Sequence, residues 1–430
     1  MWARATLLWA FLGMAFLVCL AGKALAELMS VYLPDGVPGY DADAGVTVET
    51  RLHPEQMPVG VREGDLVLAP RLEEATGYTS NALAVSPQRG SWEIVTAPSL
   101  TITSDWSRDA FGAAMSLTDT RYLALPGQDR TDFSVSAGGR LDIGDDNLTL
   151  GAAHVNAHED RSQVDTIPSD RPVAFRIDDV RAAYTLSDGP WIVVPEVQAA
   201  NYTYDPTTVA GVPTSQAYRD RLVVQAGVTV TYQLAPLRSL LLVVRAVGQD
   251  YTHTPSGQPS PNSTSYQLLA GIDYDDDSVW RWRMLAGGEA RRFASPLYAD
   301  QNTLIAEAGV GWQPSALTTV SAVLSRDTED AAQEGVSGLV YSAARLTIDH
   351  EYLRDVLLRA YAGLQRADFF QGGHQLGLTA GFGVTWVLNR NARLLFTYDQ
   401  AAVRGSSVPP QTVAGNDSRG VGLVTLRLGL

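Results

Sequence analysis

From Asp65 to the last residue, the sequence is a succession of short segments in which two kinds of side chain alternate. In Tyr266–Tyr274, for example, Tyr, Leu, Ala, Ile and Tyr occupy one set of alternate positions, and Gln, Leu, Gly and Asp occupy the other. Successive side chains of a β-strand point to opposite faces, so one face of such a segment suits lipid and the other suits water. Segments of about ten alternating residues that end in turn residues are typical of a transmembrane β-barrel.

Eighteen such segments can be laid end to end. An even number of antiparallel strands is what a single-chain bacterial barrel requires. We therefore predict an all-β fold, a transmembrane antiparallel β-barrel of about 18 strands over residues 65–430, preceded by an irregular N-terminal segment. The predicted strands start near residues 66, 92, 110, 132, 148, 175, 191, 218, 239, 265, 280, 302, 317, 339, 356, 374, 392 and 418.

The connections between these segments alternate between short and long. Short turns are expected at Asp145–Asp146, Ser187–Pro190, Ala235–Pro236, Asp276–Asp277, Gln313–Ser315 and Asn389–Asn391, and long connections at 158–174, 205–217, 252–264, 327–337 and 403–417. Short periplasmic turns and long external loops give outer-membrane barrels this rhythm. No single long connection dominates, whereas a diffusion porin usually narrows its pore with one inward-folded loop.

Aromatic residues gather at the predicted strand ends, where two interfacial belts would lie. Those beside the short turns form a candidate aromatic girdle of Trp191, Tyr232, Tyr274, Trp280, Trp282, Trp312, Tyr352 and Trp386. A soluble β-sandwich would place its aromatic residues in mid-strand, and a propeller or solenoid would repeat a motif at a fixed period. The sequence shows neither pattern.

The first 26 residues have the three parts of a secretory signal peptide. Arg4 precedes an apolar run, and the small-residue site Ala24-Leu25-Ala26 follows it. We predict cleavage before Glu27, because the run is shorter than the roughly 20 residues that span a bilayer. Residues 27–64 contain four prolines and no sustained period. They are expected to form either a periplasmic tail or a plug, and the sequence does not separate these.

Composition excludes several classes of function. The chain has 32 basic and 47 acidic residues, for a net charge of -15. This disfavours nucleic acid as a partner, because phosphate binding needs a basic surface. The single cysteine, Cys19, lies within the predicted signal peptide, so it supplies neither a disulfide framework nor a cysteine metal site to the mature protein. No metal and no cofactor are expected.

Two features of the sequence are weak candidates for catalysis or metal binding. Asp273–Ser278 spaces its aspartates as a calcium loop does, but it lacks the Gly and the Glu that the motif requires. His154, His158 and His350 each have acidic residues nearby, yet nothing resembles a nucleophile elbow or a His-Glu-x-x-His metal site. We predict that the chain is not an enzyme. An outer-membrane hydrolase is the least favoured alternative.

Charged residues are expected to point into the lumen, because an arginine that faces lipid at mid-bilayer costs about 2–4 kcal/mol. The candidate lumen-lining residues are Arg140, Arg181, Arg245, Arg281, Arg283, Glu289, Glu307, Arg345, Arg359 and Asp399. They could form ion pairs that stiffen the wall, or line a hydrated path for polar solute, or both. Eighteen strands enclose a lumen too wide for side chains alone to fill, so it must hold water or a plug.

Three stretches near the start of the predicted barrel, Gly60–Leu72, Tyr78–Asn81 and Ala97–Arg108, carry a resemblance to a known family. Together they resemble the opening of the predicted outer-membrane β-barrel family, putative β-barrel porin 2. The resemblance implies an outer-membrane protein of a Gram-negative bacterium, surrounded by outer-membrane lipid. Some relatives accompany capsule or exopolysaccharide export machinery.

Two hypotheses about transport follow. The first is a conduit for an exported exopolysaccharide, working with a periplasmic polysaccharide-export protein and an inner-membrane apparatus. The alternative is a general diffusion porin that passes small polar solutes. The sequence does not identify the solute or polymer.

Overall fold

The computed structural model describes residues 33, 36–40, 48, 56–85, 87–276, 279–405 and 417–430. The predicted signal peptide lies outside the described residues, and so does most of the segment before residue 56. In the described part of the chain, no helix is long and apolar enough to cross a membrane.

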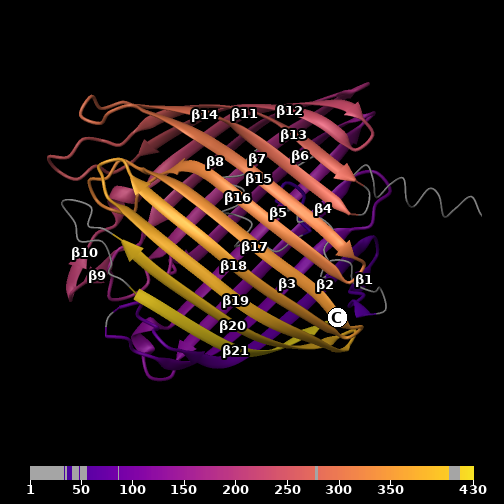
Figure 1. Cartoon of the computed structure of the whole chain (residues 1–430), viewed down its shortest axis with the longest axis horizontal. Coiled ribbons are helices and arrows are strands. Elements are labelled where there is room, and N and C mark those ends of the chain that lie inside the picture. The colour runs from indigo at the N-terminus through magenta and orange to yellow at the C-terminus, as the bar shows by residue number, and fades with distance from the viewer. Residues whose placement is uncertain are drawn as a thin grey trace, which may run out of the picture.

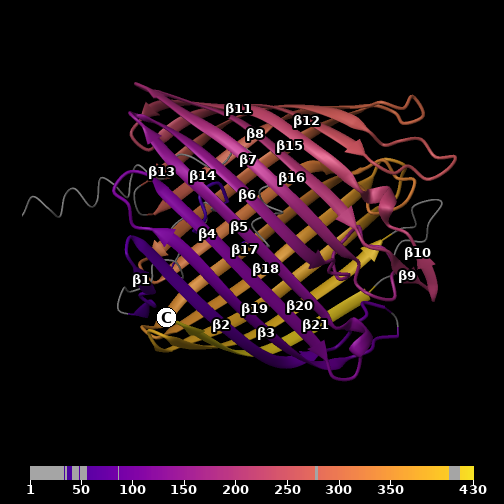
Figure 2. The ribbon, with the colours of Figure 1, turned by 180° about the vertical axis from the view of Figure 1, so that it is seen from behind.

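The described chain forms one closed antiparallel sheet (Figures 1 and 2). Nineteen strands belong to this sheet, and one of them, β1, has only three residues, so eighteen long strands make the wall. The long strands pair in chain order, and β2 pairs with β21 to close the barrel. The predicted fold class is confirmed.

The wall strands have the following bounds. They are β2 (Leu66–Thr79), β3 (Ser91–Ser104), β4 (Ala110–Tyr122), β5 (Arg130–Ile143), β6 (Asp146–His158), β7 (Ala174–Asp188), β8 (Trp191–Tyr204), β11 (Arg221–Ala235), β12 (Arg238–Tyr251), β13 (Ser263–Asp276), β14 (Trp280–Phe293), β15 (Gln301–Ser315), β16 (Thr318–Glu329), β17 (Leu339–Leu353), β18 (Val356–Phe369), β19 (His374–Asn389), β20 (Ala392–Gly405) and β21 (Asp417–Gly429). Between β8 and β11, the small hairpin of β9 (Thr207–Val209) and β10 (Val212–Thr214) stands apart from the wall.

Alternation along each strand separates an exposed apolar face from an inner face. On β12, Leu240, Leu242 and Val244 are exposed, whereas Leu241 and Val243 between them are buried. Apolar side chains on the outside of a barrel wall meet lipid. The outer surface is therefore suited to a bilayer.

The predicted strand starts lie close to those in the structure. The largest difference is at the strand predicted near residue 218, which begins at Arg221. Residues Ala217–Arg219 form a 3-10 helix instead, and the hydroxyl of Tyr218 donates a hydrogen bond to the carbonyl of Ala332 at 2.7 Å. A contact to a distant loop thus overrides the local alternation.

Three short turns come later than predicted. β11 continues through Ala235, β15 through Ser315 and β19 through Asn389. In each case the register shifts just before the turn. A β-bulge inserts an extra residue and lets the strand continue, which the turn residues alone did not reveal.

The two ends of the barrel differ. The C-terminus and the short turns lie at one end, and the β9–β10 hairpin projects at the other (Figure 1). At the short-turn end, β1 (Val61–Glu63) pairs with the start of β2, and the N–H of Gly60 donates to the carbonyl of Leu430 at 3.0 Å. β1 therefore continues the line of β21, and the sheet begins shortly before residue 65.

Candidate permeation path

An ion pair on the inner face links strands that are not neighbours. The guanidinium of Arg245 on β12 donates to Glu307 on β15 at 3.0 Å, across two intervening strands. Such a contact is possible only on the concave side of the wall. Beside it, Glu289 accepts hydrogen bonds from Ser265 at 2.6 Å and Gln267 at 3.1 Å. Three of the predicted lumen residues thus belong to one buried network.

Two strands beyond β15 along the wall, Arg359 and Asp349 form a two-bond pair between β18 and β17. The Nε–Oδ1 distance is 2.6 Å and the Nη2–Oδ2 distance is 3.2 Å. The guanidinium of Arg345 lies over the ring of Tyr361, 3.8 Å from its centroid, and the Tyr361 hydroxyl donates to Asp399. The side chain of Arg359 is 42% exposed, so this wall remains in contact with water inside the lumen.

The remaining predicted lumen residues also lie beside carboxylates. Arg140 is 3.0 Å from Asp142, Arg181 is 3.1 Å from Asp179, Arg281 is 3.7 Å from Asp275, and Arg283 is the register partner of Asp273. The inner wall therefore presents both signs of charge in close alternation, which suits exchange of hydrogen bonds with polar solute.

The residues predicted to form the aromatic girdle lie at the short-turn end. Ring centroids are 4.6 Å apart in Trp191–Tyr232, 5.3 Å in Tyr274–Trp282 and 5.3 Å in Trp280–Trp312. Tyr352 is 65% exposed, and the indole N–H of Trp386 donates to Asp355 in the adjacent turn at 3.2 Å. Rings with one polar edge near the headgroups are what an interfacial belt requires.

The three histidines that are candidate acid–base groups lie apart from one another. Nδ1 of His154 lies 2.7 Å from Asp178, Nδ1 of His158 lies 2.6 Å from Asp132, and Nδ1 of His350 lies 3.0 Å from Thr318. The first two are on the half of β6 that leads into a long loop, whereas the third is close to the short turn after β17. They do not form a joint catalytic site.

The connection between β6 and β7, residues 159–173, folds across the long-loop end of the barrel, and we call it the cap loop. Its Val164 packs against Leu339, Phe369 and Val403 on β17, β18 and β20. Seven wall strands separate β7 from β17 in one direction, and seven separate β6 from β18 in the other. The cap loop therefore reaches the opposite wall, and one long connection does fold inward, unlike the sequence-based expectation.

A second loop, residues 330–338 between β16 and β17, meets the cap loop. The N–H of Ala332 donates to Oδ2 of Asp165 at 2.7 Å, and the side-chain amide of Gln333 donates to the carbonyl of Thr166 at 3.2 Å. Gln333 and Thr166 are buried. Two loops from opposite walls are thus locked together over this end of the barrel.

Asp330 anchors the second loop to the wall. Its carboxylate lies 2.7 Å from Nε of Arg221 and 2.6 Å from Nη2 of Arg291. Burial works to raise the pKa of Asp330, but the two guanidiniums outweigh it and hold the pKa below its usual range. The anchor is therefore a charged carboxylate between two arginines.

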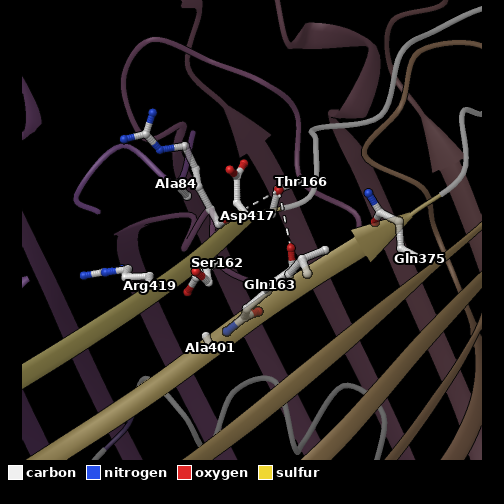
Figure 3. A pocket seen from close by; sticks show the side chains of 11 residues that line it. Ala84, Ser162, Gln163, Thr166, Gln375, Ala401, Asp417 and Arg419 are labelled. Atoms are coloured by element: carbon white, nitrogen blue, oxygen red, sulfur yellow. Dashed lines mark hydrogen bonds between the residues drawn. The ribbon is translucent and has the colours of Figure 1, made fainter. Parts of the chain in front are cut away.

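A shallow recess opens beside the cap loop (Figure 3). It is lined by Ala84, Arg161, Ser162, Gln163, Thr166, Gln375, Ala401, Val403, Asp417, Ser418 and Arg419. Removal of Arg161 from water, together with the charges of Arg419 and Arg130, lowers the pKa of Arg161 to about 10. Arg161 is still a cation at neutral pH, so this recess at the mouth is polar.

Residues 53–424 match the model of the family described as putative beta-barrel porin 2. The chain belongs to this family. The match covers nearly the whole barrel wall, so the resemblance found in the first strands extends along the chain. As a putative beta-barrel porin 2 protein with an apolar outer wall, it is located in the outer membrane of a Gram-negative bacterium.

No curated protein matches the chain. Solved structures of outer-membrane proteins are similar in fold at low identity. OpdK of Pseudomonas aeruginosa is 12% identical over 84% of this chain and 99% of its own, with a TM-score of 0.45. OccAB3 of Acinetobacter baumannii is 10% identical over 86% and 100%, with a TM-score of 0.45. OccK2 (OpdF) of P. aeruginosa is 11% identical over 85% and 98%, with a TM-score of 0.47.

Proposed function

We propose that this barrel is a porin through which small polar solutes diffuse across the outer membrane. The observation that carries the proposal is the cap loop, which crosses one end of the barrel and is locked to the loop from the opposite wall through Asp165 and Ala332. A loop folded inward restricts the width of a lumen that eighteen strands would otherwise leave wide. Small solutes are the class of cargo that such a restriction admits.

The paired charges on the inner wall support the same class of solute. A hydroxyl or carboxylate that exchanges water for one of these groups gains only about 0.5–1.5 kcal/mol per hydrogen bond, and up to about 3 kcal/mol with a charged partner. Interactions of this size orient a polar solute without retaining it. Arg359, whose side chain is 42% exposed, is one group that stays within reach of the solute.

Export of an exopolysaccharide, the first hypothesis from the sequence, has less support. A polymer needs an opening continuous in width along the whole barrel. The cap loop and the 330–338 loop are held by buried contacts, including Gln333 to Thr166. Breaking these contacts for each chain would expose polar groups that lose their partners, which costs about 1–3 kcal/mol for each group.

The test is liposome swelling with sugars of increasing size, from a pentose to a tetrasaccharide. Vesicles that contain the purified barrel should swell in the smallest sugars and exclude the largest. Removal of residues 162–168 from the cap loop should move the size limit upward. A deletion of residues 296–299 in another connection, where most side chains are exposed, is the matched control and should leave the limit unchanged.

The corresponding experiment in cells is deletion of the gene. Slower uptake of small sugars with normal surface polysaccharide agrees with the proposal. Loss of surface polysaccharide with unchanged sugar uptake, together with vesicles that do not swell, would reject it in favour of export.

A further inference from the structure

A short turn from the N-terminal segment lies against the inner wall. Val37-Pro38-Gly39-Tyr40 forms a β-turn in which the N–H of Tyr40 donates to the carbonyl of Val37 at 2.9 Å. Pro38 at the second position and Gly39, with a φ of 89°, at the third are the residues that a type II turn requires. Val37 is fully buried, and it clusters with apolar inner residues of the β4–β8 wall.

The wall has a row of glycines where this turn rests. Gly112, Gly138 and Gly151 are direct register partners on β4, β5 and β6. A Cβ at Gly112 would lie 2.3 Å from the carbonyl oxygen of Gly36, and a Cβ at Gly138 would lie 2.0 Å from that of Pro38. Glycine inside a strand often marks a place where another backbone approaches closely. The row is a trough shaped for this segment.

Polar contacts fasten the turn beside the trough. The hydroxyl of Tyr40 donates to Oδ1 of Asp179 at 2.7 Å, and a guanidinium nitrogen of Arg181 donates to the carbonyl of Gly39 at 2.8 Å. The Arg181 guanidinium also lies over the Tyr40 ring, 4.2 Å from its centroid. Arg181 is the register partner of Gly151, so the fastening continues the glycine row onto β7.

Val48 is held on another side of the lumen. It is buried, and its N–H donates to the hydroxyl of Thr319 on β16 at 3.0 Å. Seven wall strands lie between β6 and β16 in one direction and nine in the other. Thr319 is the second residue of β16 and Gly112 is the third of β4, and both strands start at the short-turn end. The chain is therefore anchored on nearly opposite walls, near the end away from the cap loop.

We propose that the two anchored parts of the N-terminal segment, Gly36–Tyr40 and Val48, which we call the strap, narrow the path at the short-turn end and set its size limit there. The inference rests on the proposed porin function and adds a second restriction to that of the cap loop. For the described residues Gly36–Tyr40 and Val48, it favours the plug over the free periplasmic tail.

The test compares two neighbouring glycines of β5 by single-channel conductance in planar bilayers. Gly138→Ala places a methyl group against Pro38 and should displace the strap. Gly139→Ala makes the same change at a position where the nearest atom to a new Cβ is 3.6 Å away. Because conductance follows the open width of the pore, it should rise about twofold for Gly138→Ala and stay at the wild-type value for Gly139→Ala.

Tyr40→Ala is the second variant, since it leaves the barrel wall unchanged and removes both the hydrogen bond to Asp179 and the ring contact with Arg181. Its conductance should also rise. Wild-type conductance in both Gly138→Ala and Tyr40→Ala would contradict the proposal. Binding of the N-terminal segment to a periplasmic protein while the barrel is folded would also contradict it.

A disulfide tests the strap independently of conduction. Val48→Cys with Thr319→Cys should crosslink in outer membranes and keep wild-type conductance. Failure of the folded barrel to crosslink would contradict the strap even if solutes pass. If the barrel folds and crosslinks but passes no solute, the proposed porin function would be rejected, whereas the position of the strap would be supported.

Discussion

The carboxylate of Asp165 accepts a hydrogen bond from the backbone N–H of Ala332 at 2.7 Å, although the two residues belong to loops on opposite walls. The other oxygen of this carboxylate, Oδ1, is buried and has no hydrogen-bond partner in the described part of the chain. The closed arrangement of the loops therefore depends on one carboxyl group in poor contact with water.

We expect the lock between the loops to weaken as pH rises. Burial raises the pKa of Asp165 well above its usual value, Glu159 and Glu329 add to this, and the Ala332 N–H and Arg219 only partly oppose it. A carboxyl whose pKa is raised in the closed state stabilises that state while protonated, and the stabilisation is lost as pH rises through the raised pKa. Conductance should therefore increase with pH.

Single-channel recordings from about pH 4 to about pH 9, across and above the ordinary carboxyl range, check this expectation. Asp165→Asn should remove the pH dependence. Asp170→Asn is the control. The hydrogen bond from the Gly211 N–H holds the pKa of Asp170 below its usual value, so Asp170 stays charged where Asp165 titrates. A pH profile that is the same in wild type and Asp165→Asn would contradict the prediction.

Asp330→Asn should destabilise the barrel strongly. The substitution leaves Arg221 and Arg291 buried without their carboxylate, and breaking a buried pair in this way costs about 3–5 kcal/mol. The control is Asp300→Asn, whose partner Arg292 is 3.6 Å away and exposed, and such surface pairs contribute about 0–1 kcal/mol. The free energy of unfolding in urea, followed on gels without boiling, measures both. Equal values for the two variants would disprove the role of the anchor.

Arg359→Gln should shift the channel toward cations. It removes a positive charge from the inner wall and leaves Asp349 unneutralised. Arg366→Gln on the same strand is the control, because Arg366 has the opposite parity and pairs with Asp368 near the long-loop end. Reversal potentials in a salt gradient should change for the first variant alone. An equal change in both would mean that Arg359 does not face the path.

Epitope tags should reveal the orientation of the barrel. A tag at residues 297–298, between β14 and β15, should bind antibody on intact cells, whereas a tag at residues 236–237, between β11 and β12, should bind only after permeabilisation. Short turns face the periplasm in outer-membrane barrels. The opposite labelling would invert the topology and place the cap loop on the periplasmic side.

Alternation predicted the wall well because it depends only on which side each residue faces. The predicted start at residue 280 agrees with the first residue of β14, because Trp280–Arg283 alternate strictly between tryptophan and arginine. The displaced turn at Gln313–Ser315 shows the limit, because a bulge changes the pairing without changing the residue types. The alternation predicts that Arg359 and Asp349 both face the lumen. It does not predict that they pair, because one sequence does not show the register between strands.

The restrictions of the lumen could not be predicted in the same way. The Asp165–Ala332 contact joins loops without a period, 167 residues apart in the sequence. The glycine row had a signal, because Gly112, Gly138 and Gly151 all lie at inward positions of neighbouring strands. Glycine is neutral in an alternation pattern, however, and the row becomes visible only when the three strands are aligned.

The pairing of β2 with β21 also constrains the order in which the molecule can be assembled. On one side, the backbone groups of Arg71–Thr79 have their hydrogen-bond partners in Val421–Gly429. These partners belong to the last strand of the wall to be synthesised. Until then both strands present open edges, which attract other chains and cannot be left in hydrocarbon. Membrane insertion and closure of this barrel are therefore expected to be coupled, because the two edges become safe from other chains and from hydrocarbon only once they pair with each other.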